Sequence, residues 1–220
     1  SAGGEALAAR IVGNELCVEG LGHGAGYQLT VRAGLQGEGA ILRADQTLDV
    51  AIPDRPRRVA FASRGLILPR FDAAGRDGAG LPIETVNVDA VRLLLLRVDD
   101  QDVAEGLAQG VVENEMGYYE VGRVAAKLGR NVWSGEIEID GERNVARRTA
   151  IPIHEIVPDL EPGVYLAILE DPEADYYEGW RTSSQWFVVS DIGLTALVGQ
   201  DGLTVAAGSL ASAATAPGVR

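Results

Sequence analysis

The chain has 220 residues, 46% of them hydrophobic and 23% charged, so it is long enough to bury a sizeable core. Its formal net charge is −13, and an acidic surface repels nucleic-acid phosphates and anionic membranes. A single cysteine, Cys17, excludes an internal disulfide, and no apolar run reaches the roughly 18 residues needed to cross a membrane. The first ten residues, SAGGEALAAR, lack the basic and apolar segments of an intact signal peptide.

Short runs rich in apolar and β-branched residues, separated by Gly, Pro or Asp, predict strands along most of the chain. They cover residues 15–21, 27–35, 47–52, 58–63, 81–88, 90–98, 132–140, 148–157, 163–170, 184–192 and 202–210. In the seventh run, Ile137 and Ile139 alternate with acidic residues, which is typical of a half-buried antiparallel strand. Regular short strands without long helices between them predict an all-β chain of serial, immunoglobulin-like antiparallel sandwiches.

Residues 99–129 interrupt the strands and predict a helical excursion within one sandwich. A short helix is expected over Gln101–Gln109, with Asp99 or Asp100 as its N-cap. A second helix is expected from four apolar residues at helical spacing, followed by a C-terminal glycine. These are Val121, Val124, Ala125, Leu128 and Gly129.

Two boundaries divide the chain. In PDRPRR, residues 53–58, two prolines exclude a continuous ladder and the charges favour exposure. The second boundary lies near Asp191. Residues 1–55 offer about three or four strands and residues 191–220 about two, whereas a sandwich needs roughly seven. We therefore expect one complete domain, 56–190, between two partial ones, and a chain cut from a longer protein.

The glycine run GLGHGAGYQLTV, residues 20–31, is not a dinucleotide site. That fingerprint needs a third glycine where Ala25 stands and a helix where a strand follows. The pattern instead predicts a tyrosine corner, in which the hydroxyl of Tyr27 bonds to upstream backbone and Gly24 permits a positive φ. DLEPGVYLAIL repeats the pattern around Tyr165, so two sandwich domains are expected.

No catalytic, cofactor-binding or metal site is predicted, and no cofactor. His23 and His154 have no Ser or Cys partner in a motif, and a hydrolase would need one of them within ~3 Å of a carboxylate or serine. Both are expected to be structural, His23 solvated in its turn and His154 pointing away from the Ile face of its strand. Cys17 is expected to be a small buried hydrophobe.

Two acidic segments leave alternatives open. Asp99, Asp100 and Asp102 are consistent with calcium binding or with helix capping, and they lack the EF-hand spacing. In EDPEADYYEGW, residues 170–180, three aromatic residues indicate either partner recognition or packing on their own sandwich. They are Tyr176, Tyr177 and Trp180.

Several blocks carry a family resemblance. In order between Leu16 and Leu210 they are LCVEGLGHGAGYQLTVRAGL, ILPR, GLPIETVNVDAVRLLLLRVDD, VWSG, RRTAIPI, GVYLAILED, QWFVVSDIGLTAL and DGLTV. Together they resemble the N-terminal macroglobulin-like region of bacterial alpha-2-macroglobulins. QWFVVSDIGLTA and ETVNVDAVRL are the most specific parts.

The resemblance implies a function. Such proteins are large periplasmic protease inhibitors, often lipid-anchored, built from serial macroglobulin domains. Many carry a bait region that attacking proteases cleave and a Cys–Gln thioester that then captures them. Cys17 is followed by Val18 and Glu19, so the thioester motif is not found here. The expectation is a non-enzymatic, periplasmic scaffold that contacts neighbouring domains, binds proteases only through its parent, and inserts into no membrane. The alternative is an adhesion module that binds a ligand or glycan through its loops.

Overall fold

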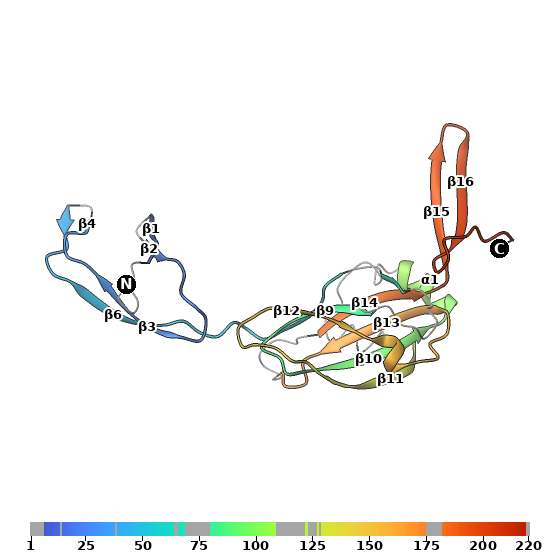
Figure 1. The fold of residues 1–220 in the computed structure, drawn as a ribbon, viewed down its shortest axis with the longest axis horizontal. Coiled ribbons are helices and arrows are strands. Elements are labelled where there is room, and N and C mark those ends of the chain that lie inside the picture. Colours follow the sequence, from blue (N-terminus) through green and yellow to red (C-terminus); the bar gives the residue numbers. More distant parts are fainter. Residues whose placement is uncertain are drawn as a thin grey trace. The chain divides into compact units, whose positions relative to one another are not determined.

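A computed structural model describes residues 7–13, 15–37, 39–63, 66–68, 80–108, 122, 127, 129–174 and 182–218. Most of them lie in strands, which confirms the predicted all-β class (Figure 1). The chain divides into two compact units, Ser1–Pro56 and Arg57–Arg220. The finer division into domains 1–55, 56–190 and 191–220 stays a prediction. None of the described helices is long and apolar enough to cross a membrane.

The first unit consists of two-stranded antiparallel ribbons. They pair β1 with β2, β3 with β6, and β4 with β5. The six short strands, where three or four were expected, are β1 (Ala9–Val12), β2 (Glu15–Val18), β3 (Gly26–Val31), β4 (Gln36–Gly37), β5 (Ala40–Ile41) and β6 (Gln46–Ala51).

The β3–β6 ribbon has one apolar face. Leu29 lies opposite Leu48, and Tyr27 lies opposite Val50 on the same side. The other side carries polar pairs such as Gln28 with Asp49, joined by a 3.2 Å hydrogen bond. Yet none of the described residues of this unit is fully buried. Isolated ribbons are marginally stable, so this apolar face needs a partner.

The second unit contains a two-layer sandwich (Figure 1). One sheet has the order β11-β10-β13-β14-β8 and the other β12-β9-β7. All neighbours are antiparallel except β14 and β8. The strands are β7 (Arg58–Phe61), β8 (Leu66–Leu68), β9 (Leu81–Val86), β10 (Ala90–Val98), β11 (Gly129–Glu138), β12 (Arg147–Ile151), β13 (Gly163–Glu170) and β14 (Thr182–Val189).

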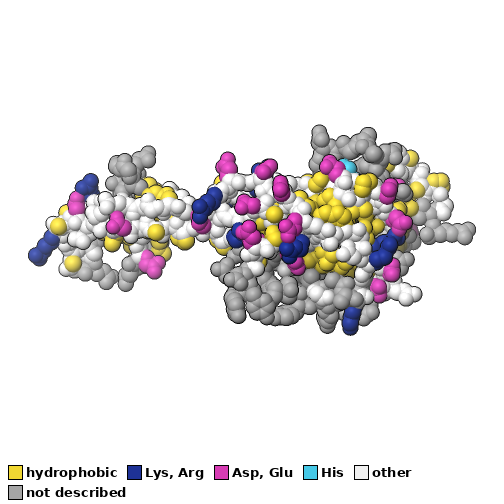
Figure 2. All heavy atoms as spheres, turned by 90° about the horizontal axis from the view of Figure 1, so that it is seen from below, with side chains coloured by type: hydrophobic (Ala, Val, Ile, Leu, Met, Phe, Trp, Pro, Cys, Tyr) yellow, Lys and Arg dark blue, Asp and Glu magenta, His cyan; other side chains and the backbone are white. Residues whose placement is uncertain are grey.

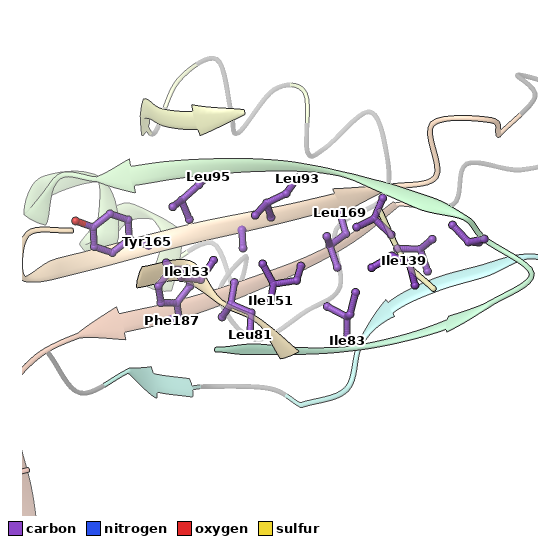
Figure 3. Packing of buried hydrophobic residues seen from close by; sticks show 14 of the residues in the cluster. Leu81, Ile83, Leu93, Leu95, Ile139, Ile151, Ile153, Tyr165, Leu169 and Phe187 are labelled. Carbon is purple, nitrogen blue, oxygen red and sulfur yellow. The ribbon is translucent and has the colours of Figure 1, made fainter. Parts of the chain in front are cut away.

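The core lies between these two sheets. Figure 3 shows Leu93 and Leu95 of β10 pointing toward Leu81 and Ile151 of the opposite sheet. All four side chains are essentially inaccessible to solvent. Fully burying one such side chain stabilises a fold by about 1.5–3 kcal/mol, so this layer contributes strongly to holding the two sheets together. The predicted alternation around Ile137 is also confirmed, because Ile137 packs on the core while Glu136 and Glu138 are exposed.

β10 is buried on both faces, which explains its unbroken leucine run, residues 93–96. Leu96 points away from the inter-sheet core and packs with Leu166 and Trp186 in a second cluster. Val103 of α1 (Asp100–Ala108) covers this cluster. The helix predicted over Gln101–Gln109 is thereby confirmed. Within the second predicted helix, Val121 to Leu128, the structure describes only Gly122 and Lys127, both helical, and the four apolar residues of the pattern lie outside the described residues.

The strand predicted over residues 148–157 is wrong in its second half. β12 ends at Ile151, and Ile153–Ile156 form a short helix, α3. Pro152 is the cause, since it has no N–H for the ladder, while its carbonyl accepts hydrogen bonds from the backbone of Glu155 (3.0 Å) and Ile156 (3.3 Å).

The last two strands form a separate hairpin, β15 (Ile192–Gly199) and β16 (Gly202–Ser209). Cross-strand pairs alternate between its faces. One face is apolar, with Leu194 opposite Ala207 and Val198 opposite Leu203. Val198 is 86% exposed and Leu194 68% exposed, so this face is uncovered in the described chain.

Candidate functional site

The two histidines have structural contacts. His23 Nδ1 lies 3.1 Å from the carbonyl oxygen of Pro53, at the start of the linker, so it is not simply solvated. His154 lies in α3 rather than in a strand, and its Nε2 is 3.8 Å from Oε1 of the adjacent Glu155. Both imidazoles are exposed. Neither contact has the ~3 Å geometry of a catalytic base with a serine or carboxylate.

Cys17 lies in β2 and is half-buried, so it is more accessible than the predicted buried hydrophobe. Its cross-strand neighbour is Arg10, whose guanidinium makes a 3.0 Å ion pair with the exposed Glu19. The sequence could not place Arg10 beside the thiol, because the pairing depends on the β1–β2 register.

The described residues give no support to the calcium alternative at residues 99–102. No group of three or more His, Cys, Asp or Glu side chains there could hold a metal ion. The backbone carbonyl of Asp99 accepts hydrogen bonds from the N–H groups of Asp102 (2.9 Å) and Val103 (3.0 Å), which places Asp99 at the start of α1. Tyr176, Tyr177 and Trp180 lie outside the described residues.

The tyrosine corner at Tyr27 is confirmed. The Gly22 N–H donates a 2.7 Å hydrogen bond to the Tyr27 hydroxyl, five residues downstream. A Cβ at Gly22 would lie 3.2 Å from the Tyr27 oxygen, a tight contact that a shift of a few tenths of an ångström would have to relieve. Gly24 has φ +72° and donates its N–H to Ile52 (3.0 Å), which ties the turn to the end of β6.

The second corner, at Tyr165, is also confirmed. Its hydroxyl donates a 2.6 Å hydrogen bond to the carbonyl of Glu161. Its ring is 1% exposed and stacks on Phe187, with centroids 5.4 Å apart. Burial raises the pKa of the Tyr165 phenol. Arg97, its cross-strand neighbour, pairs with Glu161 and donates to the Pro162 carbonyl at 3.2 Å, which holds the corner from the other strand.

An ion-pair cluster anchors the first residue of the second unit. Arg57 Nε and Nη2 each donate a 2.8 Å hydrogen bond to Asp171, whose side chain is fully buried. Arg57 Nη1 lies 3.0 Å from Glu173, which is exposed. The hydrogen bonds and charge of Asp171 raise the pKa of Arg57. The expectation that the linker charges are exposed is wrong for Arg57, whose side chain is only 26% exposed.

The sequence does not indicate that Arg57 pairs with Asp171, because 114 positions separate them.

Elsewhere too, arginines lie beside carboxylates, as with Arg92 and Glu136 (2.8 Å) or Arg32 and Asp45 (2.6 Å). Figure 2 shows this mixture of charges on one face of the molecule. The hydrogen bonds that Asp45 accepts from the Ala33 N–H and from Arg32 lower the pKa of its carboxyl.

The chain enters the sandwich at one end and leaves it at the other. Arg58 begins β7 opposite Val86, where β9 ends and turns toward β10. β14 runs away from this end, from Thr182 opposite Glu170 to Val189 opposite Gly163. The hairpin then begins at Ile192, beyond the far end (Figure 1). A domain with this path can be joined in series with others.

Comparison with known families identifies this architecture. A family model described as the bacterial alpha-2 macroglobulin MG2 domain matches residues 60–187. The chain belongs to the bacterial alpha-2-macroglobulin family. The match spans the sandwich from β7 to β14, so the family resemblance seen in the sequence is confirmed.

Known relatives agree with the assignment. An alpha-2-macroglobulin of Xylella fastidiosa is 31% identical over 160 residues, which are 70% of this chain and 9% of that protein. A crystal structure of the Escherichia coli protein, described as spanning domains NIE-MG1, is 27% identical with a TM-score of 0.58, and the match covers 73% of each chain. The trypsin-activated Escherichia coli protein is 26% identical with a TM-score of 0.56, over 71% of this chain and 10% of that one. This macroglobulin chain thus spans about a tenth of the length of its curated relatives.

Proposed function

We propose that these residues form a non-catalytic scaffold segment of a bacterial alpha-2-macroglobulin that inhibits proteases in the periplasm. The longer parent would trap the proteases, while this segment spaces and connects its domains. The observation that carries the proposal is the path of the chain, which enters the sandwich at Arg58 and leaves it at Val189, at opposite ends.

The uncovered apolar faces support a serial architecture. The β3–β6 face around Leu29 and Leu48 and the hairpin face around Leu194 and Val198 lie on either side of the sandwich in sequence. Each is an amphipathic ribbon without a closed core in the described chain. Residues 1–55 and 191–220 would therefore be parts of neighbouring macroglobulin domains, completed by strands outside this sequence.

A role that needs no chemistry from this segment is supported by its contacts. Its histidines contact a backbone carbonyl and an adjacent carboxylate, and the buried carboxylate of Asp171 pairs with Arg57. The family relationship supports protease inhibition by the parent, since its Escherichia coli relative is described as trypsin-activated. The periplasm is the compartment in which the parent would meet foreign proteases.

Two proteins test the proposal, the 220-residue chain and its full-length parent. Each is incubated with trypsin, and the remaining activity is measured on a large protein substrate while adducts are followed by denaturing electrophoresis. We expect inhibition by the parent and neither inhibition nor adduct with the chain alone. Inhibition by the chain alone would refute the scaffold role of this segment. An inactive parent would refute the assignment of the parent as a protease inhibitor. Fractionation of cells that express the parent tests the periplasmic location.

A further inference from the structure

The linker contains three of the residues that trypsin-like proteases recognise. Arg55, Arg57 and Arg58 lie within six residues, 53–58, between the two units. Exposed linkers are the preferred sites of proteolytic nicking. Cleavage after arginine requires that its side chain enter the protease's specificity pocket and that the following peptide bond reach the catalytic serine. The three arginines differ in how they fail these two requirements.

Arg57 cannot offer its side chain without breaking its anchor. Its guanidinium makes two 2.8 Å hydrogen bonds to the fully buried Asp171 and lies 3.0 Å from Glu173. Withdrawal of Arg57 into a protease would break both of its hydrogen bonds to the buried Asp171 carboxylate. Breaking a buried pair in this way is strongly unfavourable, so the cleavable state is rarely populated.

Arg58 is protected by the sheet. It is the first residue of β7, and its register partner is Val86 of β9. Its guanidinium lies 3.7 Å from Glu84 of the same neighbouring strand. The next residue, Val59, is buried in the core. Cleavage after Arg58 would require β7 to leave β9, at the cost of this part of the core.

Arg55 is protected by its neighbour. Pro56 follows it, so the scissile bond would be a tertiary amide without an N–H, and the proline ring restricts the conformation of Arg55. Pro56 is exposed, so nothing in the burial of this position requires a proline. We propose that the linker is built to resist proteases that cut after arginine, with Pro56, the Asp171 pair and the β7 ladder each protecting one arginine.

This inference goes beyond the proposed function and does not depend on it. It concerns the cleavage chemistry of one segment, and it holds whether or not the parent inhibits proteases. In a scaffold that is exposed to proteases, such resistance would direct cleavage away from the linker at residues 53–58. The failure of either proposal leaves the other standing.

The test measures the rate of trypsin cleavage at each linker bond by mass spectrometry. The folded chain is compared with a synthetic peptide of residues 50–61, which contains the same three arginines without the protecting fold. We expect cleavage after Arg57 and Arg58 to be at least about 100-fold slower in the folded chain than in the peptide, as the cost of breaking a buried pair implies. Equal rates in protein and peptide would overturn the proposal.

Three variants separate the contributions. Pro56→Ala should open the bond after Arg55 without touching the sandwich, and an unchanged rate there would refute the role of Pro56. Asp171→Asn should accelerate cleavage after Arg57 by at least about tenfold. Glu173→Gln is the matched control, because it removes only the exposed partner and should change the rate less than about threefold. Equal effects of Asp171→Asn and Glu173→Gln on the cleavage rate would refute the role of the buried pair. A thermal melt of each variant distinguishes local opening of the linker from unfolding of the sandwich.

Discussion

The buried tyrosine corner at Tyr165 allows a test of what one hydrogen bond contributes to the stability of the sandwich. In Tyr165→Phe, the ring and its 5.4 Å stack on Phe187 remain, and only the hydroxyl that donates 2.6 Å to Glu161 is lost. The net value of such a bond is about 1 kcal/mol. Tyr165→Ala also removes a ring that is 1% exposed, and should cost about 3–5 kcal/mol.

The assay is urea unfolding followed by tryptophan fluorescence. All three tryptophans, Trp133, Trp180 and Trp186, belong to the second unit, so the signal reports on that unit alone. With a denaturant slope of about 2 kcal/mol per molar, Tyr165→Phe should lower the midpoint by about 0.5 M and Tyr165→Ala by about 2 M. Tyr27→Phe is the matched control, since Tyr27 lies in the first unit.

Two results would refute this reasoning. If Tyr165→Phe leaves the midpoint unchanged, the hydroxyl bond to Glu161 does not stabilise the sandwich. If Tyr27→Phe lowers the tryptophan midpoint as much as Tyr165→Phe, the two units do not unfold independently and the loss in Tyr165→Phe cannot be assigned to the Glu161 bond.

Three further predictions concern charge, pH and the exposed hairpin. Arg57→Met should lower the unfolding free energy of the second unit by about 3–5 kcal/mol in urea titrations, and adding Asp171→Leu should recover most of the loss. A double variant that is no more stable than the single one would refute the role of the uncompensated charge. Burial raises the pKa of Tyr165, so the stabilising effect of the neutral phenol is complete below the unfolded-state pKa near 10 and is lost as pH rises through the folded-state pKa. The urea midpoint should therefore fall more steeply above pH ~10 in the wild type than in Tyr165→Phe. Parallel curves of midpoint against pH would contradict this prediction. Replacing Leu194, Val198 and Leu203 by Ser should reduce the fluorescence of a hydrophobic dye such as ANS, whereas Leu197→Ser on the opposite face should reduce it less. An unchanged signal with the triple variant would show that the face of Leu194, Val198 and Leu203 is covered.

Features that depend on residues close in sequence were predictable. The corner bonds join Tyr27 to Gly22 and Tyr165 to Glu161, five and four positions apart, so a Gly–Tyr pattern is sufficient to predict them. The alternation around Ile137 and the helix at residues 100–108 are likewise local. Pro152 was also a local signal, and the prediction of one strand through it gave too much weight to the surrounding isoleucines.

Features that depend on pairing between distant segments were not predictable. β8 is three residues long and lies parallel to β14, with Leu66 opposite Phe187, and no alternation marks so short a strand. Arg57 and Asp171 belong to two different charged segments, each of which alone indicates an exposed loop. A polar residue is expected at the surface unless its partner is known, and that partner is fixed only by the closed fold.

The contrast between the two corners connects the fold with the proposed function. Both hydroxyl bonds are formed, yet the Tyr165 ring lies in a closed core while Tyr27 lies in a unit without a fully buried described residue. A corner is therefore a local feature whose hydroxyl bond is made with or without a fully buried core around the tyrosine. A segment whose middle is closed and whose two flanks expose apolar ribbons is suited to a place within a series of domains, where each flank is completed by its neighbour. The rigidity of such a series depends on its junctions, and the anchor between Arg57 and Asp171 lies at one of them.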